Sequence, residues 1–182
     1  CMWTTKYLRY HFKRWNIKTI TIKNYKPGKA LNEGIKVSKG DFIVCLSAHC
    51  PPIDENWLRN LLRNFKTKNI GGVYGRQIPT SFTSDYDKRD LFLTFGLDKK
   101  IQIKDSFFHN ANSMIPREVL KKFPFNDEVK NIEDRLWGQE IIKAGYKIVY
   151  EPEASVYHYH GIHQNNRLDR LENVVKIMEK NL

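Results

Sequence analysis

Apolar residues alternate along the chain between the spacing of helices and that of strands, which is typical of an α/β domain. Residues 17–22 (IKTITI) alternate as a half-buried strand does, whereas residues 41–46 (DFIVCL) are nearly continuously apolar, as expected of a buried parallel strand. We also expect helices at residues 3–15, 29–38, 54–65, 116–123, 132–144 and 167–182, extended segments at 71–78, 107–115, 147–150 and 154–158, and a polar loop at 80–104 with one short helix near 86–95.

The bulk composition indicates a single globular domain with an anionic partner. A chain of 182 residues with 41% hydrophobic residues buries one core and is not of the disordered class. The formal net charge of +11 favours a nucleic acid, an anionic membrane surface or a phosphorylated substrate. Three cysteines without a CxxC pair signal neither a disulfide framework nor a zinc ribbon, which favours a cytoplasmic location. No apolar run approaches the roughly 18 residues of a membrane span, so membrane association would be peripheral, at the inner face.

An acidic pair, Glu133 and Asp134, begins the expected helix at residues 132–144. One interpretation is a capping pair, because carboxylates in a first turn are stabilised by the free amide groups and the helix dipole. The other is a catalytic base, because a carboxylate at the rim of a pocket can take a proton from a hydroxyl nucleophile. Trp137 and Gly138 follow one turn later and could form a floor for a sugar ring.

Histidines near the carboxyl end of the chain suggest a metal site. His158 and His160 face the same side if the strand at residues 154–158 continues, and two imidazoles on one face can ligate one divalent ion. His49 follows the apolar strand at residues 41–46, at the edge of the sheet where α/β proteins bind ligands, and is the candidate third ligand. Imidazole ligands favour Mn²⁺ over the harder Mg²⁺. The alternative is that His49 hydrogen-bonds a phosphate and no ion binds.

Arg76 and Gln77 come directly after an apolar strand. They form either a simple turn or a contact to an anion or hydroxyl group at the edge of the sheet. The P-loop, the GxSxG nucleophile elbow and the Rossmann GxGxxG motif are all absent.

Several motifs, taken in order, resemble those of family 2 glycosyltransferases. The stretch PGKALNEGI at residues 27–35, followed by KGDFIV at 39–44, is similar to the G-x-A-x-N-x-G stretch of that family. Further similarities are WL at 57–58, YGRQIP at 74–79, NANS at 110–113, FNDE at 125–128, ED at 133–134, GYKI at 145–148, EPEA at 151–154 and HYH at 158–160. The resemblance spans residues 25–164 and is greatest to the bacterial rhamnosyltransferase-like branch.

The resemblance implies a GT-A fold, with a Rossmann-like mixed sheet flanked by helices, formed by residues 1–182 as one domain that lacks the family's first strand and helix. It implies an inverting transfer of a sugar from a nucleotide-sugar donor to a hydroxyl of a glycan or glycolipid acceptor, in the synthesis of surface polysaccharide or glycoconjugate. Asp134 would be the base, assisted by Glu133. The residues expected to contact donor or acceptor are Lys29, Asn32, Ser47, Arg76, Gln77, Asn112 and Trp137.

The DxD-type metal motif of the family corresponds to Ser47–Ala48–His49, so both of its aspartates are absent here. His49 takes the place of the second aspartate, and His158 or His160 would complete the site. Loss of the aspartates keeps open a catalytically inactive domain that only binds sugar or nucleotide. A histidine-ligated metallohydrolase would need a denser set of ligands. A nucleic-acid-binding module would need a basic face or a known motif, whereas the charges are dispersed, so we expect no nucleic-acid partner.

Overall fold

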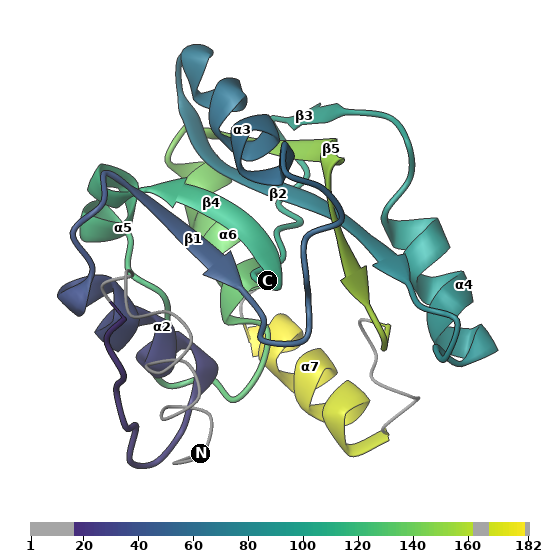
Figure 1. The fold of residues 1–182 in the computed structure, drawn as a ribbon. Coiled ribbons are helices and arrows are strands. Elements are labelled where there is room, and N and C mark those ends of the chain that lie inside the picture. Colours follow the sequence, from purple (N-terminus) through teal and green to yellow (C-terminus); the bar gives the residue numbers. More distant parts are fainter. Residues whose placement is uncertain (1–16, 162–167, 181–182) are drawn as a thin grey trace.

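The computed structural model describes residues 17–161 and 168–180, and shows a five-stranded mixed sheet with helices on both faces (Figure 1). The α/β fold class expected from the sequence is therefore confirmed. The strands are β1 (Phe42–Leu46), β2 (Ile70–Pro79), β3 (Lys100–Gln102), β4 (Asn112–Pro116) and β5 (Lys147–His158). The helices are α2 (Pro27–Val37), α3 (Trp57–Leu62), η1 (Arg63–Lys66), α4 (Asp85–Thr94), α5 (Arg117–Lys122), α6 (Glu133–Lys143) and α7 (Leu168–Lys180).

The strands are ordered β1-β4-β2-β5-β3. The central pair, β2 and β5, is parallel, whereas β4 is antiparallel to both β1 and β2, and β3 is antiparallel to β5. The carboxyl ends of β1, β2 and β5 therefore lie along the same side of the sheet, next to the residues that enter β4.

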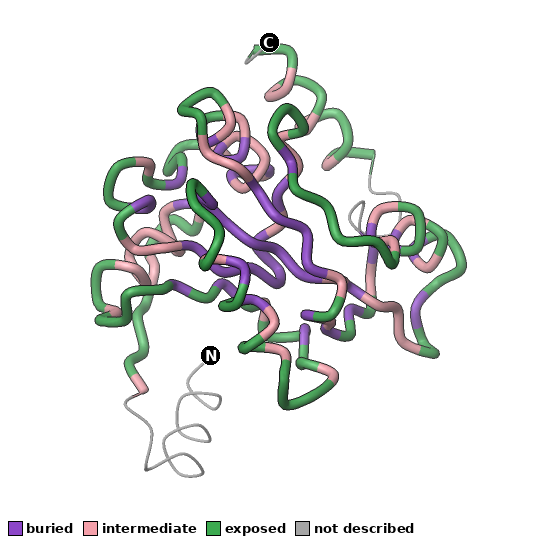
Figure 2. Tube along the Cα trace, turned by 90° about the horizontal axis from the view of Figure 1, so that it is seen from above, coloured by how far each residue is buried: buried purple, intermediate pink, exposed green. Residues whose placement is uncertain are grey.

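The core occupies both faces of the central strands. Consecutive residues of a strand point to opposite faces, so Val73 of β2 packs in the cluster that contains Leu61 of α3, whereas Tyr74 packs in the cluster that contains Trp137 and Ile141 of α6. The buried stretches run through the middle of the sheet and the exposed ones surround it (Figure 2). This double coverage makes β2 and β5 a rigid support for side chains at their ends.

Local sequence signals place the ends of two helices that border the site. Helix α2 begins at Pro27, whose fixed φ and missing N–H suit a first helical position. Helix α6 ends before Gly145, which has a φ of 84° that glycine adopts without steric cost. Within α6, Gly138 allows the helix to approach the loop before β4, because a Cβ atom there would lie 2.1 Å from the Ser106 carbonyl oxygen.

Three expectations about strands were wrong. Residues 17–22 form no strand, and in the described part of the structure they have no neighbouring strand to pair with. Residues 107–111 are irregular, and the strand begins only at Asn112. Residues 147–158 form one strand, not two, because an irregular pairing between Gly75 and Gln77 of β2 accommodates the extra residues around Pro152.

The strand at residues 41–46 exists, but it is neither parallel to its partner nor fully buried. Within the described residues β1 pairs only with β4, antiparallel, and its exposed and buried residues alternate. The apolar run reflects contacts on one face and leaves Phe42, Val44 and Leu46 partly exposed on the other. The helix expected at residues 3–15 lies outside the described residues. No described helix is long and apolar enough to cross a bilayer.

Candidate active site

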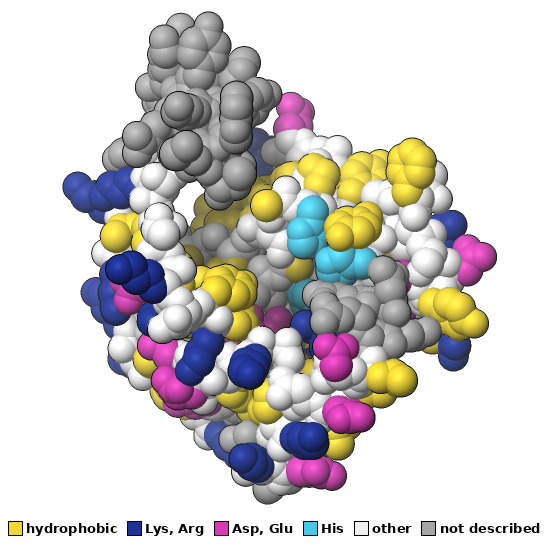
Figure 3. All heavy atoms as spheres, turned by 90° about the horizontal axis from the view of Figure 1, so that it is seen from below, with side chains coloured by type: hydrophobic (Ala, Val, Ile, Leu, Met, Phe, Trp, Pro, Cys, Tyr) yellow, Lys and Arg dark blue, Asp and Glu magenta, His cyan; other side chains and the backbone are white. Residues whose placement is uncertain are grey.

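A cavity of about 990 Å³ opens where the carboxyl ends of β1 and β5 meet the amino end of α6. Its walls come from α2, the turn after β1, the segment before β4, residues 130–135, the end of β5 and one side of α7. On this face of the molecule, histidine side chains gather beside a hollow (Figure 3). The cavity brings together the acidic pair Glu133 and Asp134 and the histidines His49, His158 and His160, and Ser47 also lines it.

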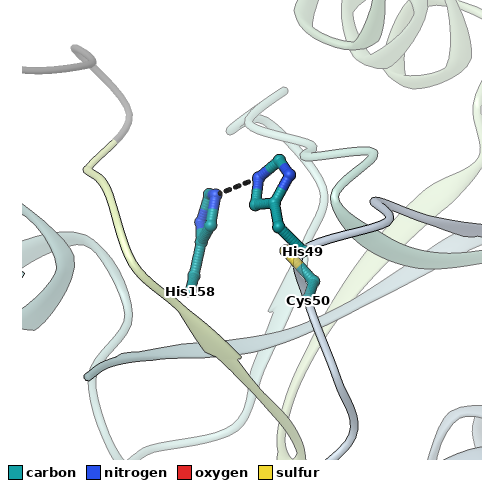
Figure 4. Close-up of side chains that lie close together, drawn as sticks. All are labelled: His49, Cys50 and His158. Carbon is teal, nitrogen blue, oxygen red and sulfur yellow. Dashed lines mark hydrogen bonds between the residues drawn. The ribbon is translucent and has the colours of Figure 1, made fainter. Parts of the chain in front are cut away.

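Two histidines from opposite ends of the sequence meet at the cavity. His49 lies in the turn after β1, and His158 is the last residue of β5. Their Nε2 atoms are 3.0 Å apart, and the rings are stacked with centroids 4.9 Å apart (Figure 4). The His160 ring lies close to both, with its centroid 4.9 Å from that of His49 and 4.3 Å from that of His158.

The environment keeps His49 and His158 uncharged. Burial, followed by the charges of His160, His109 and His49, lowers the pKa of His158 to about 3. Burial and the charge of His160 lower the pKa of His49 as well. Both imidazoles are therefore neutral at pH 7, which is the form whose nitrogen lone pair binds a metal ion.

The donor atoms fit a divalent cation held by imidazoles. Two donor atoms that each lie about 2.1 Å from one ion, with a right angle between the two bonds, are about 3.0 Å apart. The Nε2 atoms of His49 and His158 have this separation. Cys50 also has its donor atom within 4.8 Å of both. Its thiol is buried, and burial raises its pKa to about 12, so Cys50 would have to lose a proton to bind an ion. The two neutral imidazoles can bind an ion without losing one.

The acidic pair lines the same cavity as the histidines and lies in the first turn of α6. The backbone N–H groups of Asn110 and Arg135 donate to the two Asp134 carboxylate oxygens, at 3.0 and 2.9 Å. These bonds hold the carboxylate in one orientation. Glu133 is 8% exposed and accepts a bond from the Asn110 side chain at 3.4 Å. Burial, followed by the negative charge of Asp134, raises the pKa of Glu133.

The residue before this pair has a strained backbone. Ile132 precedes α6 with a φ of 57°, a left-handed conformation that is unfavourable for a β-branched residue. Its side chain is buried and lines the cavity. The surrounding packing therefore fixes the backbone at the point where the acidic pair enters the site.

Sequence reasoning missed His109, which lines the cavity together with the other histidines and Asp134. Its Nδ1 accepts a bond from the Ala111 N–H at 3.2 Å, so the proton of the neutral ring is on Nε2. Burial lowers the pKa of His109. The available sequence signal was its position directly before the NANS stretch at residues 110–113. The cationic lining residues Lys130, Arg135 and Arg170 were also missed.

Six expected contact residues do not line the cavity, and for these the structure corrects the sequence-based expectation. Trp137 is buried in the core and donates from Nε1 to the Phe123 carbonyl, so its ring is not a sugar platform. Asn32 is bonded to the backbone N–H and carbonyl of Phe125, and Lys29 points to the Lys23 carbonyl.

The other three expected contact residues, Asn112, Arg76 and Gln77, belong to strands β4 and β2 of the sheet. Asn112 is fully buried: Trp57 donates to its side-chain oxygen, and its amide group donates to the carbonyls of Arg76 and Ala154. Arg76 donates from Nε to the Phe95 carbonyl, on the side of α4. Gln77 is 1% exposed and contacts His158 instead of the cavity.

Comparison with known proteins now places the chain. Residues 4–123 match the model of the family described as glycosyl transferase family 2. The chain belongs to glycosyl transferase family 2. Two relatives are O-antigen chain rhamnosyltransferases: WbaN of Salmonella anatum, 29% identical over 80% of this chain and 50% of the relative, and RfbN of Salmonella typhimurium, 26% identical over 81% and 51%. The chain thus spans about half the length of these curated relatives.

The fold is shared with solved glycosyltransferases. The mannosyltransferase PcManGT from Pyrobaculum calidifontis, in complex with GDP-Man and Mn²⁺, superposes with a TM-score of 0.67 at 16% identity, over 86% of this chain and 43% of that one. The GT-A fold is therefore confirmed, as is the resemblance to the rhamnosyltransferase-like branch. As the family's motif suggested, His49 of the Ser47–Ala48–His49 segment reaches the same cavity as Asp134.

Proposed function

We propose that this chain is the catalytic part of an inverting glycosyltransferase. It moves a sugar from a nucleoside diphosphate to a hydroxyl of a glycan or glycolipid during synthesis of surface polysaccharide or glycoconjugate. The observation that carries the proposal is that one cavity holds both an oriented carboxylate, Asp134, and two neutral imidazoles, His49 and His158. The rhamnosyltransferase relatives support the substrate class. A metallohydrolase or a nucleic-acid-binding module is not favoured by membership of this family.

Asp134 is the proposed general base. Its carboxylate takes the proton of the acceptor hydroxyl as that oxygen bonds to the anomeric carbon, and the bond from that carbon to the diphosphate oxygen breaks. A single displacement from the opposite face inverts the anomeric centre. The two backbone N–H donors that hold Asp134 orient its carboxylate before the acceptor binds. Glu133, being buried beside it, has the supporting role.

The leaving diphosphate requires positive charge. His49, His158 and His160 would hold a divalent cation, more readily Mn²⁺ than Mg²⁺, which when bound neutralises the developing charge. The Mn²⁺ in the PcManGT complex supports this choice. Arg135 and Lys130 line the same cavity and would contribute charge with or without the ion. Placement at the inner face of the cytoplasmic membrane, through a peripheral contact, stays a prediction.

The test of the base is Asp134→Asn, with the exposed Asp98→Asn as a matched control. The donors are UDP-, dTDP-, GDP- and CMP-sugars, screened by thermal shift with and without Mn²⁺ and then assayed for release of nucleoside diphosphate. Asp134→Asn should keep the thermal shift and lower turnover by about two to four orders of magnitude. Near-normal turnover would show that the pair only caps α6. A thermal shift without turnover in the unmodified chain would instead indicate an inactive binding domain.

The test of the cation is the same assay in excess EDTA, followed by addition of Mn²⁺ or Mg²⁺. We expect EDTA to abolish turnover and Mn²⁺ to restore it better than Mg²⁺. Full turnover in EDTA would assign diphosphate stabilisation to cationic side chains and leave the role of Asp134 unchanged.

A further inference from the structure

A buried hydrogen bond connects Gln77 to the histidine cluster. The Gln77 Oε1 and the His158 Nδ1 are 2.5 Å apart, and the two side chains are 1% and 2% exposed. An amide oxygen can only accept a hydrogen bond, so the proton of the neutral ring is on Nδ1. The Nε2 of His158 then carries a lone pair, and this is the atom that lies 3.0 Å from the His49 Nε2.

The strand register explains how Gln77 reaches this ring. Gln77 of β2 pairs with Val156 of β5, and Pro79 pairs with His158. Paired residues share a face, and so do residues two apart on a strand, so Gln77 and His158 are diagonal neighbours on one face. The irregular pairing between Gly75 and Gln77 sets this register. Arg76, on the other face, points to α4.

His49 differs from His158 in having no such restraint. Among the described residues, the hydrogen bond that His49 makes through its side chain is the one between the two Nε2 atoms. With a lone pair on His158, His49 donates from Nε2 in the absence of a cation. When a cation binds at the His158 Nε2, the His49 proton can move from Nε2 to Nδ1, so that the His49 Nε2 also has a lone pair for the cation. His158 is thus the fixed ligand and His49 the adaptable one.

A glutamine side chain at this position carries an energetic cost. The Gln77 Nε2 is buried and has no hydrogen-bond partner among the described residues. An unpartnered buried donor is unfavourable, and a methionine of similar volume would avoid it. Packing alone therefore does not account for this side chain, whereas the bond from its oxygen to His158 does.

We propose that Gln77 is a positioning residue whose Oε1 holds His158 as the Nδ1–H tautomer and so directs the bare Nε2 toward a cation shared with His49. This inference rests on the cation site of the proposed function. It adds to that site the residue that fixes one ligand's protonation and ring orientation. Partners that hold a ligating histidine in this way commonly affect metal affinity by 10- to 100-fold.

The test compares Gln77→Met, which lacks the acceptor, with Gln77→Glu, which restores it, and with Ile78→Met on the opposite face of β2 as control. Histidine tautomers are read from two-bond ¹H–¹⁵N spectra of the full chain without metal at pH 7, with His158→Ala to assign the signal. The dissociation constant for Mn²⁺ alone is measured from the electron paramagnetic resonance of the free ion, and the melting temperature reports folding.

We expect the Nδ1–H pattern for His158 in the unmodified chain, in Gln77→Glu and in Ile78→Met. Gln77→Met should show a substantial Nε2–H population and bind Mn²⁺ about 10- to 100-fold more weakly, while Gln77→Glu stays within a few-fold. An Nε2–H pattern in the unmodified chain would overturn the inference, even if Gln77→Met fails to fold. So would unmeasurable Mn²⁺ binding, or unchanged affinity in a folded Gln77→Met. Neither readout uses donor or acceptor, so absence of sugar transfer would count against the proposed function alone.

Discussion

Replacement of Glu133 by glutamine should stabilise the protein in a pH-dependent way. The Glu133 side chain is 8% exposed and lies beside Asp134 at the start of α6. Burial first, and then the charge of Asp134, raise its pKa from 4.5 to about 7. Glutamine has the same shape and keeps an oxygen that can accept the bond from Asn110. The substitution therefore removes the titration and little else.

The direction of this pH dependence follows from the number of protons that Glu133 binds in the folded and in the unfolded state. Between about pH 4.5 and 7 the folded protein retains a proton on Glu133 that the unfolded chain has released, so stability falls as the pH rises through this window. Above pH 7 the loss is constant. A shift from 4.5 to about 7 corresponds to a loss of about 3 to 4 kcal/mol, since each pKa unit is worth about 1.4 kcal/mol. Glu133→Gln should thus be the more stable form at pH 8, with the difference closing toward pH 4.

The assay is urea unfolding of both forms between pH 4.5 and 8, followed by circular dichroism. Glu128→Gln is the control, because Glu128 is exposed and its ion pair with Lys26 lowers its pKa. That carboxylate stabilises the fold above its unfolded pKa, so its loss should cost a little stability at neutral pH and nothing in acid. A Glu133→Gln form that is less stable at pH 8, or whose stability differs from that of the unmodified protein by the same amount at every pH, would show that the pKa of Glu133 is not raised in the folded protein.

Two further changes test the packing around the site, each by urea unfolding. Gly138→Ala should lower the free energy of unfolding by about 1–3 kcal/mol or more, because its Cβ would lie 2.1 Å from the Ser106 carbonyl oxygen. Gly34→Ala is the control: its Cβ meets nothing within 4 Å, so it should raise the free energy of unfolding by about 0.5–1 kcal/mol. Equal effects would refute the close approach. Asn112→Ala should lose about 3–5 kcal/mol, because the Trp57 N–H and two backbone carbonyls lose a buried partner. A loss below about 1 kcal/mol would contradict this reading.

Helices were largely predictable because their signals are local. Pro27 marks the start of α2, and the acidic pair and Gly145 mark the two ends of α6 within a residue or two. Strand partners are not local. The apolar run that forms β1 reads equally well as a buried parallel strand, and only pairing with β4 shows it to be antiparallel. The two strands expected at residues 147–150 and 154–158 are one strand, because the irregular register of β5 against β2 accommodates the residues between them.

The candidate site residues show the same contrast between what local sequence signals and what only the folded chain can reveal. The approach of His49 to His158 could be predicted because each lies at or just after the end of a strand, and strand ends on one side of a sheet converge. Asn112 and Trp137 were misassigned because a polar group that binds a ligand and one that bonds to the protein's own backbone look alike in sequence. Only the folded structure shows that both are used internally.

These internal bonds matter because they connect the two halves of the site. The carboxylates are held by α6, and the histidines by the turn after β1 and the end of β5. The short stretch that enters β4 contacts both: the Asn110 N–H donates to Asp134, and two residues later Asn112 donates to the Ala154 carbonyl in the irregular part of β5 that leads to His158. These two hydrogen bonds therefore contribute to the separation between the proposed base and the proposed cation site. A change at Asn112 should consequently alter the geometry of transfer even in variants that still fold.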